Sequence, residues 1–205
     1  MRFENLTFGE QVHSTGVTLV DEVLAGRGHA EDATRIPATD ALITKLEDVP
    51  LAVLTADCVP VLFADPATGA VAAVHAGWRG ITAGIIERTI DALVGNFGVE
   101  RRAVKSFVGP AIGACCYEIG DEVVSRLTAG DLGCITETEG RTWLNLKACC
   151  AGRMEKSGLD PANIFTVDAC TRCMPELLFS HRRDGADRGS NISIVARLKE
   201  SGTRG

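Results

Sequence analysis

Short apolar runs alternate with polar turns in the middle of the chain. Residues 51–54, 59–63 and 70–74 are mostly aliphatic, and a turn cluster of Asp, Pro, Thr and Gly falls within residues 65–69. Apolar runs of this length that end at turn residues are typical of buried strands. The pattern therefore predicts a buried β-hairpin in this region, with its last two runs joined by the turn at 65–69.

The rest of the chain predicts strands and helices in mixed order. Helical spacing of apolar residues predicts a helix over residues 81–95, and further helices are expected at 121–127 and 146–157. Further strands are expected within 1–25 and at 40–44, 103–108, 164–167 and 192–195, with a surface loop at 26–39. This β-rich alternation favours an α+β fold, with mixed sheets and flanking helices, over a purely parallel one.

Length, composition and charge narrow the classes of protein and partner. No low-complexity linker divides the 205 residues, so we expect one domain over residues 1–205. The net charge of −6 argues against nucleic acid or an anionic membrane surface as a principal partner. The first residues lack the basic start and apolar core of a signal peptide, and we expect a cytoplasmic protein with reduced cysteines. The oligomeric state is not predicted.

Cys58 and His75 flank the apolar runs of the predicted hairpin. They would lie near the open ends of neighbouring strands about 4.8 Å apart, where two side chains on one face could share an ion or a proton. A catalytic zinc ion usually has three protein ligands and one open position, so a third ligand is needed. Of the four histidines, His13 and His181 are the candidates, and the residues alone leave the choice between them open.

Polar residues beside this pair could supply further chemistry. Asp57 could act as a general acid or base, but neighbouring strand residues point to opposite faces, so a bend in the chain is required. Arg182 and Arg183 could bind a phosphate or carboxylate group, because guanidinium groups form paired hydrogen bonds with such anions. A solvated turn with a local ion pair is the alternative for these two arginines.

The other cysteines favour ordinary structural roles. Cys149 and Cys150 follow a helical pattern, where cysteine is a small core residue. Cys170 and Cys173 have the spacing of half a zinc knuckle or of a redox motif, but no second pair at knuckle spacing completes it. The spacing alone therefore does not predict a metal site at this motif.

Four segments carry a resemblance to a known family. The sequences Thr-Ala-Asp-Cys at 55–58, His-Ala-Gly-Trp-Arg-Gly at 75–80, Gly-Pro-Ala-Ile-Gly at 109–113 and Phe-Ser-His-Arg-Arg-Asp-Gly at 179–185 resemble the laccase-domain (YfiH-type) family, whose members are called both polyphenol oxidases and purine nucleoside phosphorylases. The resemblance implies that zinc is held by His13, Cys58 and His75, which selects His13 over His181. It also implies a compact α+β domain, similar to the catalytic domain of cytotoxic necrotizing factors.

What the resemblance implies for activity is a zinc-dependent purine nucleoside enzyme. It would carry out phosphorolysis of adenosine, inosine and methylthioadenosine, together with deamination of adenosine. A water molecule with a lowered pKa suits deamination at C6 of the purine. Phosphorolysis needs an anion site for phosphate, and Arg79, Arg182 and Arg183 are the available guanidinium groups. A purine nucleoside and phosphate are therefore the expected partners.

Three alternatives follow from the same residues. A multicopper oxidase is excluded, because its blue-copper site and trinuclear cluster need more imidazoles than four histidines supply. A cysteine hydrolase or amidase would use Cys58 as nucleophile and His75 as base. For the zinc-dependent nucleoside enzyme and for the cysteine hydrolase alike, the candidate catalytic residues are Asp57, Cys58 and His75. Family members usually begin with a further segment ahead of the Gln-Val-His motif, which raises the hypothesis of a non-catalytic zinc-binding remnant.

Overall fold

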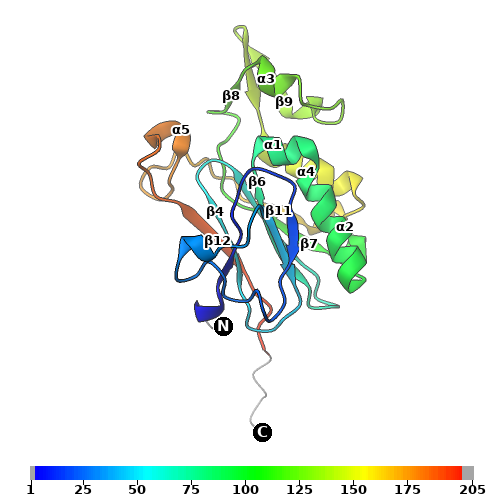
Figure 1. Cartoon of the computed structure of the whole chain (residues 1–205). Coiled ribbons are helices and arrows are strands. Elements are labelled where there is room, and N and C mark those ends of the chain that lie inside the picture. Colours follow the sequence, from blue (N-terminus) through cyan, green and yellow to red (C-terminus); the bar gives the residue numbers. More distant parts are fainter. Residues whose placement is uncertain (1–2, 200–205) are drawn as a thin grey trace.

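The centre of the fold is a mixed six-stranded sheet, seen in a computed structural model that describes residues 3–199 (Figure 1). Its strands occur in the order β11 (Ile164–Thr166), β7 (Lys105–Val108), β5 (Val59–Ala64), β6 (Val71–Ala76), β3 (Ala41–Thr44) and β2 (Val17–Leu19). The outermost pair on each side is parallel and the inner pairs are antiparallel. Every residue of β6 is buried, as the apolar run at 70–74 predicts, and the burial extends to His75 and Ala76.

The predicted hairpin is confirmed for β5 and β6, but not for the first apolar run. Strand β4 (Leu51–Thr55) leaves the central sheet and lies between β1 (Thr7–Phe8) and β12 (Asn191–Val195) in a second sheet. The two sheets share a core that includes Leu42, Leu51 and Val71. The chain therefore crosses from one sheet to the other at residues 56–58, just ahead of β5. Apolar runs predict burial without saying in which sheet a strand pairs.

Helices cover the other side of the central sheet (Figure 1). They are α1 (Trp78–Ala83), α2 (Ile85–Phe97) and α4 (Leu146–Lys156). The single helix predicted over 81–95 is wrong, because Gly84 has a φ of 94° and ends α1 in the left-handed conformation. The apolar spacing continues across this break, since Ile81 and Ile85 are both buried in the same core. The layers of helices and mixed sheets confirm the expected α+β class.

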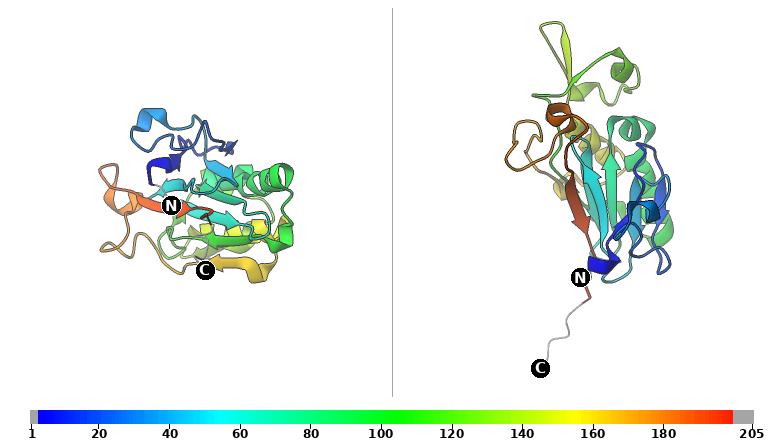
Figure 2. Two further views of the ribbon diagram at one scale, coloured as in Figure 1. Left: turned by 90° about the horizontal axis from the view of Figure 1, so that it is seen from below. Right: turned by 60° about the vertical axis from the view of Figure 1, so that its left-hand side comes forward.

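A small three-stranded antiparallel sheet projects from the body, clear of the two larger sheets (Figures 1 and 2). It contains β8 (Glu118–Ile119), β10 (Arg141–Leu144) and β9 (Ile135–Thr138), and α3 (Asp121–Val124) lies beside it. None of these strands was predicted, because β9 is largely exposed and shows no apolar alternation. The helix expected over 121–127 ends already at Val124.

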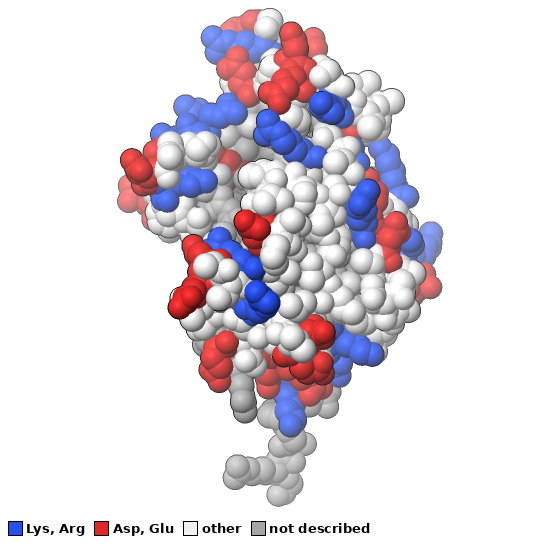
Figure 3. Space-filling model, in the orientation of Figure 1, with Lys and Arg blue, Asp and Glu red and all other residues white. Residues whose placement is uncertain are grey.

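Short elements complete the described chain. They are the 3-10 helices η1 (Phe3–Asn5), η2 (Asp32–Thr34), η3 (Arg101–Ala103), η4 (Leu132–Cys134) and η5 (Pro161–Asn163), and the one-turn helix α5 (His181–Asp184). None of the helices within residues 3–199 has both the length and the apolar character needed to cross a membrane. Acidic and basic side chains are interspersed around the face shown in Figure 3, which has a largely uncharged centre.

Candidate metal centre

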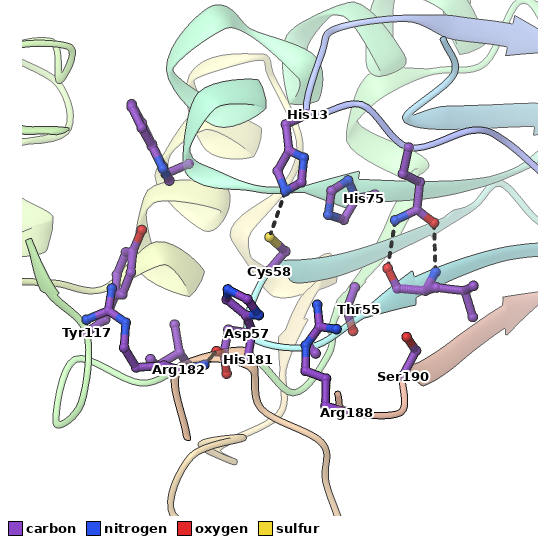
Figure 4. A pocket seen from close by; sticks show the side chains of 15 residues that line it. His13, Thr55, Asp57, Cys58, His75, Tyr117, His181, Arg182, Arg188 and Ser190 are labelled. Carbon is purple, nitrogen blue, oxygen red and sulfur yellow. Dashed lines mark hydrogen bonds between the residues drawn. The ribbon is translucent and has the colours of Figure 1, made fainter. Parts of the chain in front are cut away.

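His13, Cys58 and His75 converge from three segments, and together they form what we call the open site (Figure 4). Cys58 directly precedes β5, and His75 lies in β6 opposite Pro60, so the hairpin register places them side by side. His13 arrives on the loop before β2. The ligand atoms lie within 4.8 Å of one another, and the Cys58 Sγ to His13 Nε2 distance is 3.7 Å. This group could hold a metal ion.

The buried carboxylate of Asp40 fixes two of the three ligands. Its Oδ1 lies 2.8 Å from Nδ1 of His75 and accepts a hydrogen bond from the backbone N–H of His13 at 3.0 Å. Its Oδ2 accepts from the backbone N–H of Val12 and from the backbone N–H and hydroxyl of Ser14. Metal-binding histidines usually donate their second ring N–H to such a carboxylate. Asp40 therefore holds His75 with Nε2 free for a ligand, and it ties down the loop that carries His13.

The charges at this site favour a thiolate. Burial alone would raise the pKa of the Cys58 thiol, but hydrogen bonds from His13 and His75 outweigh it and lower the pKa to about 6. Burial would lower the pKa of His75, yet the hydrogen bonds to Asp40 and Cys58 raise it to about 9. The pKa of Asp40 is lowered, since burial is outweighed by its bonds to His75 and Ser14. A deprotonated thiol is the form that binds metals and acts as a nucleophile.

The backbone beside the ligands leaves no room for a larger residue. A Cβ atom on Gly77 would lie 2.7 Å from Cδ2 of His13 and 3.1 Å from Sγ of Cys58. The glycine turn after β6 therefore lets the chain pass directly against two ligands before α1 begins.

A pocket of about 420 Å³ opens beside the three ligands. Besides them it is lined by residues from the end of β4, the crossover at residues 56–58, the loop before β8 and the segment 181–190, as Figure 4 shows for Asp57, Tyr117, His181, Arg182 and Arg188. The volume falls within the range of about 300–1,000 Å³ that is common for small-molecule sites. The ligands thus face a space large enough for a substrate.

Asp57 sits in the bend that the sequence analysis required. Its φ of 97° turns the chain between the two sheets, and its carboxylate points toward the segment after β11. One oxygen accepts the hydroxyl of Thr171 and the other accepts the backbone N–H of Arg182, each within 2.6 Å. Asp57 lines the pocket and also anchors the loop that forms its far wall.

The three arginines named from sequence do not lie together. Arg182 lines the pocket, with its guanidinium carbon 5.2 Å from the ring centre of Tyr117. Arg79 lies in a neighbouring depression and forms an exposed 3.0 Å ion pair with Glu122. Arg183 donates to Asp184 and to backbone carbonyls of the same loop, and within the described chain it does not line the pocket.

The pocket also contains Arg188 and Gln11, which the sequence did not single out, and His181, which it named as a candidate ligand. Arg188 lines the pocket, and its buried Nε has no hydrogen-bond partner among residues 3–199. Gln11 forms paired hydrogen bonds with the backbone of Leu54 and so fixes the loop leading to His13. His181 also lines the pocket, but its Nδ1 lies 3.1 Å from the carbonyl of Gly185, and the described ligand group does not include it. The one sequence feature that could have indicated Arg188 is that three arginines fall within residues 182–188.

Comparisons with known proteins bear on the whole chain. A sequence model of the family described as multi-copper polyphenol oxidoreductase laccase matches residues 1–198. The purine nucleoside phosphorylase YlmD of Geobacillus stearothermophilus is 33% identical over 196 residues, which are 93% of this chain and 72% of that protein. Adenosine deaminase RL5, from an unknown prokaryotic organism, is 31% identical over 199 residues, which are 95% of this chain and 76% of that protein.

Solved structures share the same fold. The crystal structure of YlmD from Geobacillus stearothermophilus matches with a TM-score of 0.92 at 33% identity, over 96% of this chain and 75% of that one. The hypothetical protein YfiH of Bacillus licheniformis matches with a TM-score of 0.91 at 32% identity, over 97% of this chain and 76% of that one. These matches confirm the α+β fold of the YfiH type.

Proposed function

We propose that this chain, which belongs to the family described as multi-copper polyphenol oxidoreductase laccase, is a zinc-dependent purine nucleoside enzyme. Its reactions would be phosphorolysis of adenosine, inosine and methylthioadenosine, and deamination of adenosine. The observation that carries the proposal is the convergence of three metal-ligand atoms beside a substrate-sized pocket. The printed names of YlmD and RL5, a phosphorylase and a deaminase, support the two activities.

The donor set fits zinc. Two imidazole nitrogens and one thiolate are ligands that zinc accepts in catalytic sites with an open fourth position. A bound zinc ion supplies Lewis acidity and lowers the pKa of water toward neutrality. Multicopper oxidation is not part of the proposal, because the four histidines of the chain cannot supply its copper centres.

The chain's own residues would bind and orient the substrate around this ion. Asp40 keeps His75 in the orientation that exposes Nε2, and Cys58 enters as a thiolate. Tyr117 and Trp78 line the pocket and offer apolar surface for a purine base. We assign Asp57 the role of holding the far wall in place, since both carboxylate oxygens already accept hydrogen bonds.

Arg182 and Arg188 are the best placed groups for phosphate. Both line the pocket, and the partnerless Nε of Arg188 is a donor that an anion would satisfy. Arg79 would need to exchange its exposed pair with Glu122 to take part. Arg183 would act by holding the loop, through its bonds to the carbonyls of Thr171 and Leu178.

Product analysis tests this function. The purified protein is incubated with adenosine, with and without phosphate, and the products are separated by chromatography. Adenine formed only with phosphate indicates phosphorolysis, and inosine formed without phosphate indicates deamination. Activity should disappear with a chelator and return with zinc. If no product forms at high protein concentration in the zinc-loaded state, the chain is a non-catalytic zinc-binding protein and the proposal is wrong.

A cysteine hydrolase or amidase is the second candidate. The lowered pKa of Cys58, with His75 beside it, is the observation that favours this candidate, because a thiolate paired with an imidazole is an activated nucleophile. Alkylation of Cys58 removes activity in both cases. The candidates separate when metal-free protein is assayed on nucleosides and amides: activity that survives chelation supports the cysteine mechanism.

A further inference from the structure

Four cysteines outside the open site gather where two loops meet, and together they form what we call the cysteine cluster. Cys115 and Cys116 lie in the loop after β7, and Cys170 and Cys173 lie in the loop after β11. Their four Sγ atoms all lie within 4.8 Å of one another. We propose that the cysteine cluster binds a second zinc ion, which fastens these two loops together.

The sulfur spacing is close to that of a tetrahedral site. Zinc–sulfur bonds of about 2.3 Å place the sulfurs of a tetrahedron about 3.8 Å apart. Sγ of Cys173 lies 3.8 Å from Sγ of Cys115 and 3.3 Å from Sγ of Cys116. A disulfide needs a separation of about 2.05 Å and joins only two sulfurs, and all four cysteines are free in the structure. Three sulfurs this close, with the fourth within 4.8 Å, form a group that one central ion could join.

The backbone is shaped to hold thiolates. The N–H of Gly113 donates to Sγ of Cys170 at 3.2 Å, a hydrogen bond of the kind that supports sulfur ligands around a metal. A Cβ atom on Gly113 would lie 3.1 Å from Sγ of Cys115 and 3.2 Å from Cβ of Cys170, so a side chain would crowd the cluster. The N–H of Cys173 also donates to the carbonyl of Cys170 and closes the turn between these two cysteines.

The composition of the cluster indicates a structural ion. Four thiolates fill a tetrahedral coordination shell and leave no position for water or substrate, unlike the three ligands of the open site. Cysteine is also a poor choice for exposed positions unless it has a partner, and Cys115 and Cys173 are both exposed. A shared zinc ion gives these exposed thiols a role.

The ion would stabilise the wall of the neighbouring pocket. Tyr117, which lines the pocket, directly follows Cys116, and Thr171, which donates to Asp57, directly follows Cys170. The two loops also meet at a short bridge between Ala111 and Cys170 and at the hydrogen bond from Gly113 to Cys170. A zinc ion at the cluster would therefore join the segment bearing Tyr117 to the segment bearing Thr171.

Metal analysis of the full chain tests the second site. We expect two zinc ions per chain in the native protein, one in the Cys170→Ser/Cys173→Ser variant and one in His13→Ala. Cys134→Ser, at a half-buried cysteine outside both groups, should keep two. The proposal is wrong if the native protein and the double cysteine variant both contain one zinc ion. It is also wrong if mass spectrometry shows that the cluster holds no metal and is closed by a disulfide.

Cobalt substitution keeps the test decisive if the double cysteine variant does not fold. Cobalt in a tetrathiolate site gives a strong thiolate-to-metal charge-transfer band, much stronger than that of a site with one thiolate. We expect His13→Ala to keep most of this band. Loss of most of the band in His13→Ala would overturn the second site while leaving the open site intact. Conversely, an inactive nucleoside assay with an unchanged band would refute only the proposed function.

Discussion

The open site and the cysteine cluster differ both in their ligands and in what supports them. The open site has three ligands, two of them at the ends of paired strands, and the buried Asp40 fixes its geometry. The cysteine cluster has four ligands, all on loops. Three ligands leave a coordination position for chemistry, and four do not. The fold thus places two of the open site's three ligands at strand ends, whereas the closed arrangement lies where two loops meet.

The largest expected effect distinguishes the open site, which serves activity, from the cysteine cluster, which serves stability. His13 is exposed on a loop, so in protein whose open site holds no zinc His13→Ala should leave the unfolding temperature nearly unchanged. The variant should lower the zinc affinity of the open site by more than about 100-fold and abolish turnover. Cys170→Ser/Cys173→Ser should instead lower the unfolding temperature, because it frees two loops. Zinc titration, turnover and thermal melts measure the three quantities. His181→Ala is the control, and equal zinc occupancy in His13→Ala and His181→Ala contradicts the ligand assignment.

A smaller effect is expected from the group behind the ligands. Asp40→Asn keeps the shape but loses the charge that orients His75 and anchors the His13 loop, so zinc affinity at the open site should fall by about 10–100-fold. The cobalt band of the cysteine cluster should not change. Asp91→Asn, which removes an exposed ion pair with Arg101, is the matched control and should bind zinc normally. An unaffected affinity in Asp40→Asn would mean that the strands alone hold the ligands.

The pocket wall provides the next test, because it lies between the two groups. Arg182→Ala removes a guanidinium that lines the pocket, and hydrogen bonds to charged groups contribute about 1.5–3 kcal/mol. The KM for phosphate should rise by at least about 10-fold, with little change in the deamination of adenosine. Arg79→Ala, outside this pocket, should have a weaker effect. Equal effects of the two substitutions on the KM for phosphate would remove Arg182 from the anion site.

The sequence predicted those parts of the fold that depend on local pattern. The β5–β6 hairpin follows from two apolar runs and from turn chemistry at residues 65–69, where the carboxylate of Asp65 accepts the hydroxyl and backbone N–H of Thr68. The projecting sheet was missed because exposed strands lack a buried face to create alternation. Its Glu139-Gly140 turn, with both φ values positive, was the available signal.

Both groups of ligands are formed by contacts between segments that are distant in the sequence. Local sequence patterns do not predict such contacts. Cys58 and His75 could be paired from sequence because one hairpin brings them together. His13 was selected only by family resemblance, and Asp40 was overlooked because a single acid ahead of a strand has many ordinary roles. The Cys170 motif lacked a second pair at knuckle spacing, and the adjacent pair at residues 115 and 116 completes the group through tertiary contact alone.

Thiol reactivity is the smallest expected difference between the two groups, and its sign follows from the pKa values. In zinc-free, reduced protein the Cys58 thiolate is present above about pH 6 and is lost as the pH falls through that value, compared with an ordinary pKa of 9.0. Burial and hydrogen bonds to neighbouring cysteines raise the pKa of Cys115 to about 12, so it stays protonated at neutral pH. In the same cluster, burial at Cys170 is outweighed by hydrogen bonds that lower its pKa to about 7, so Cys115 rather than Cys170 provides the contrast with Cys58. Alkylation of Cys58 should therefore have its midpoint near pH 6, and that of Cys115 should rise only in strong base.

The rate advantage of Cys58 is modest even so. At pH 7 its thiolate fraction exceeds that of an ordinary cysteine by about 90-fold, but nucleophilicity falls with pKa by roughly 20-fold over three units, which leaves a net gain of about four-fold. Peptide mapping by mass spectrometry after timed alkylation measures each cysteine separately, with His75→Gln as the comparison that removes the imidazolium. Added zinc should protect both groups. A Cys58 midpoint near pH 9 would show that the imidazoles do not hold a thiolate, and the open site would then take up zinc only with release of the thiol proton.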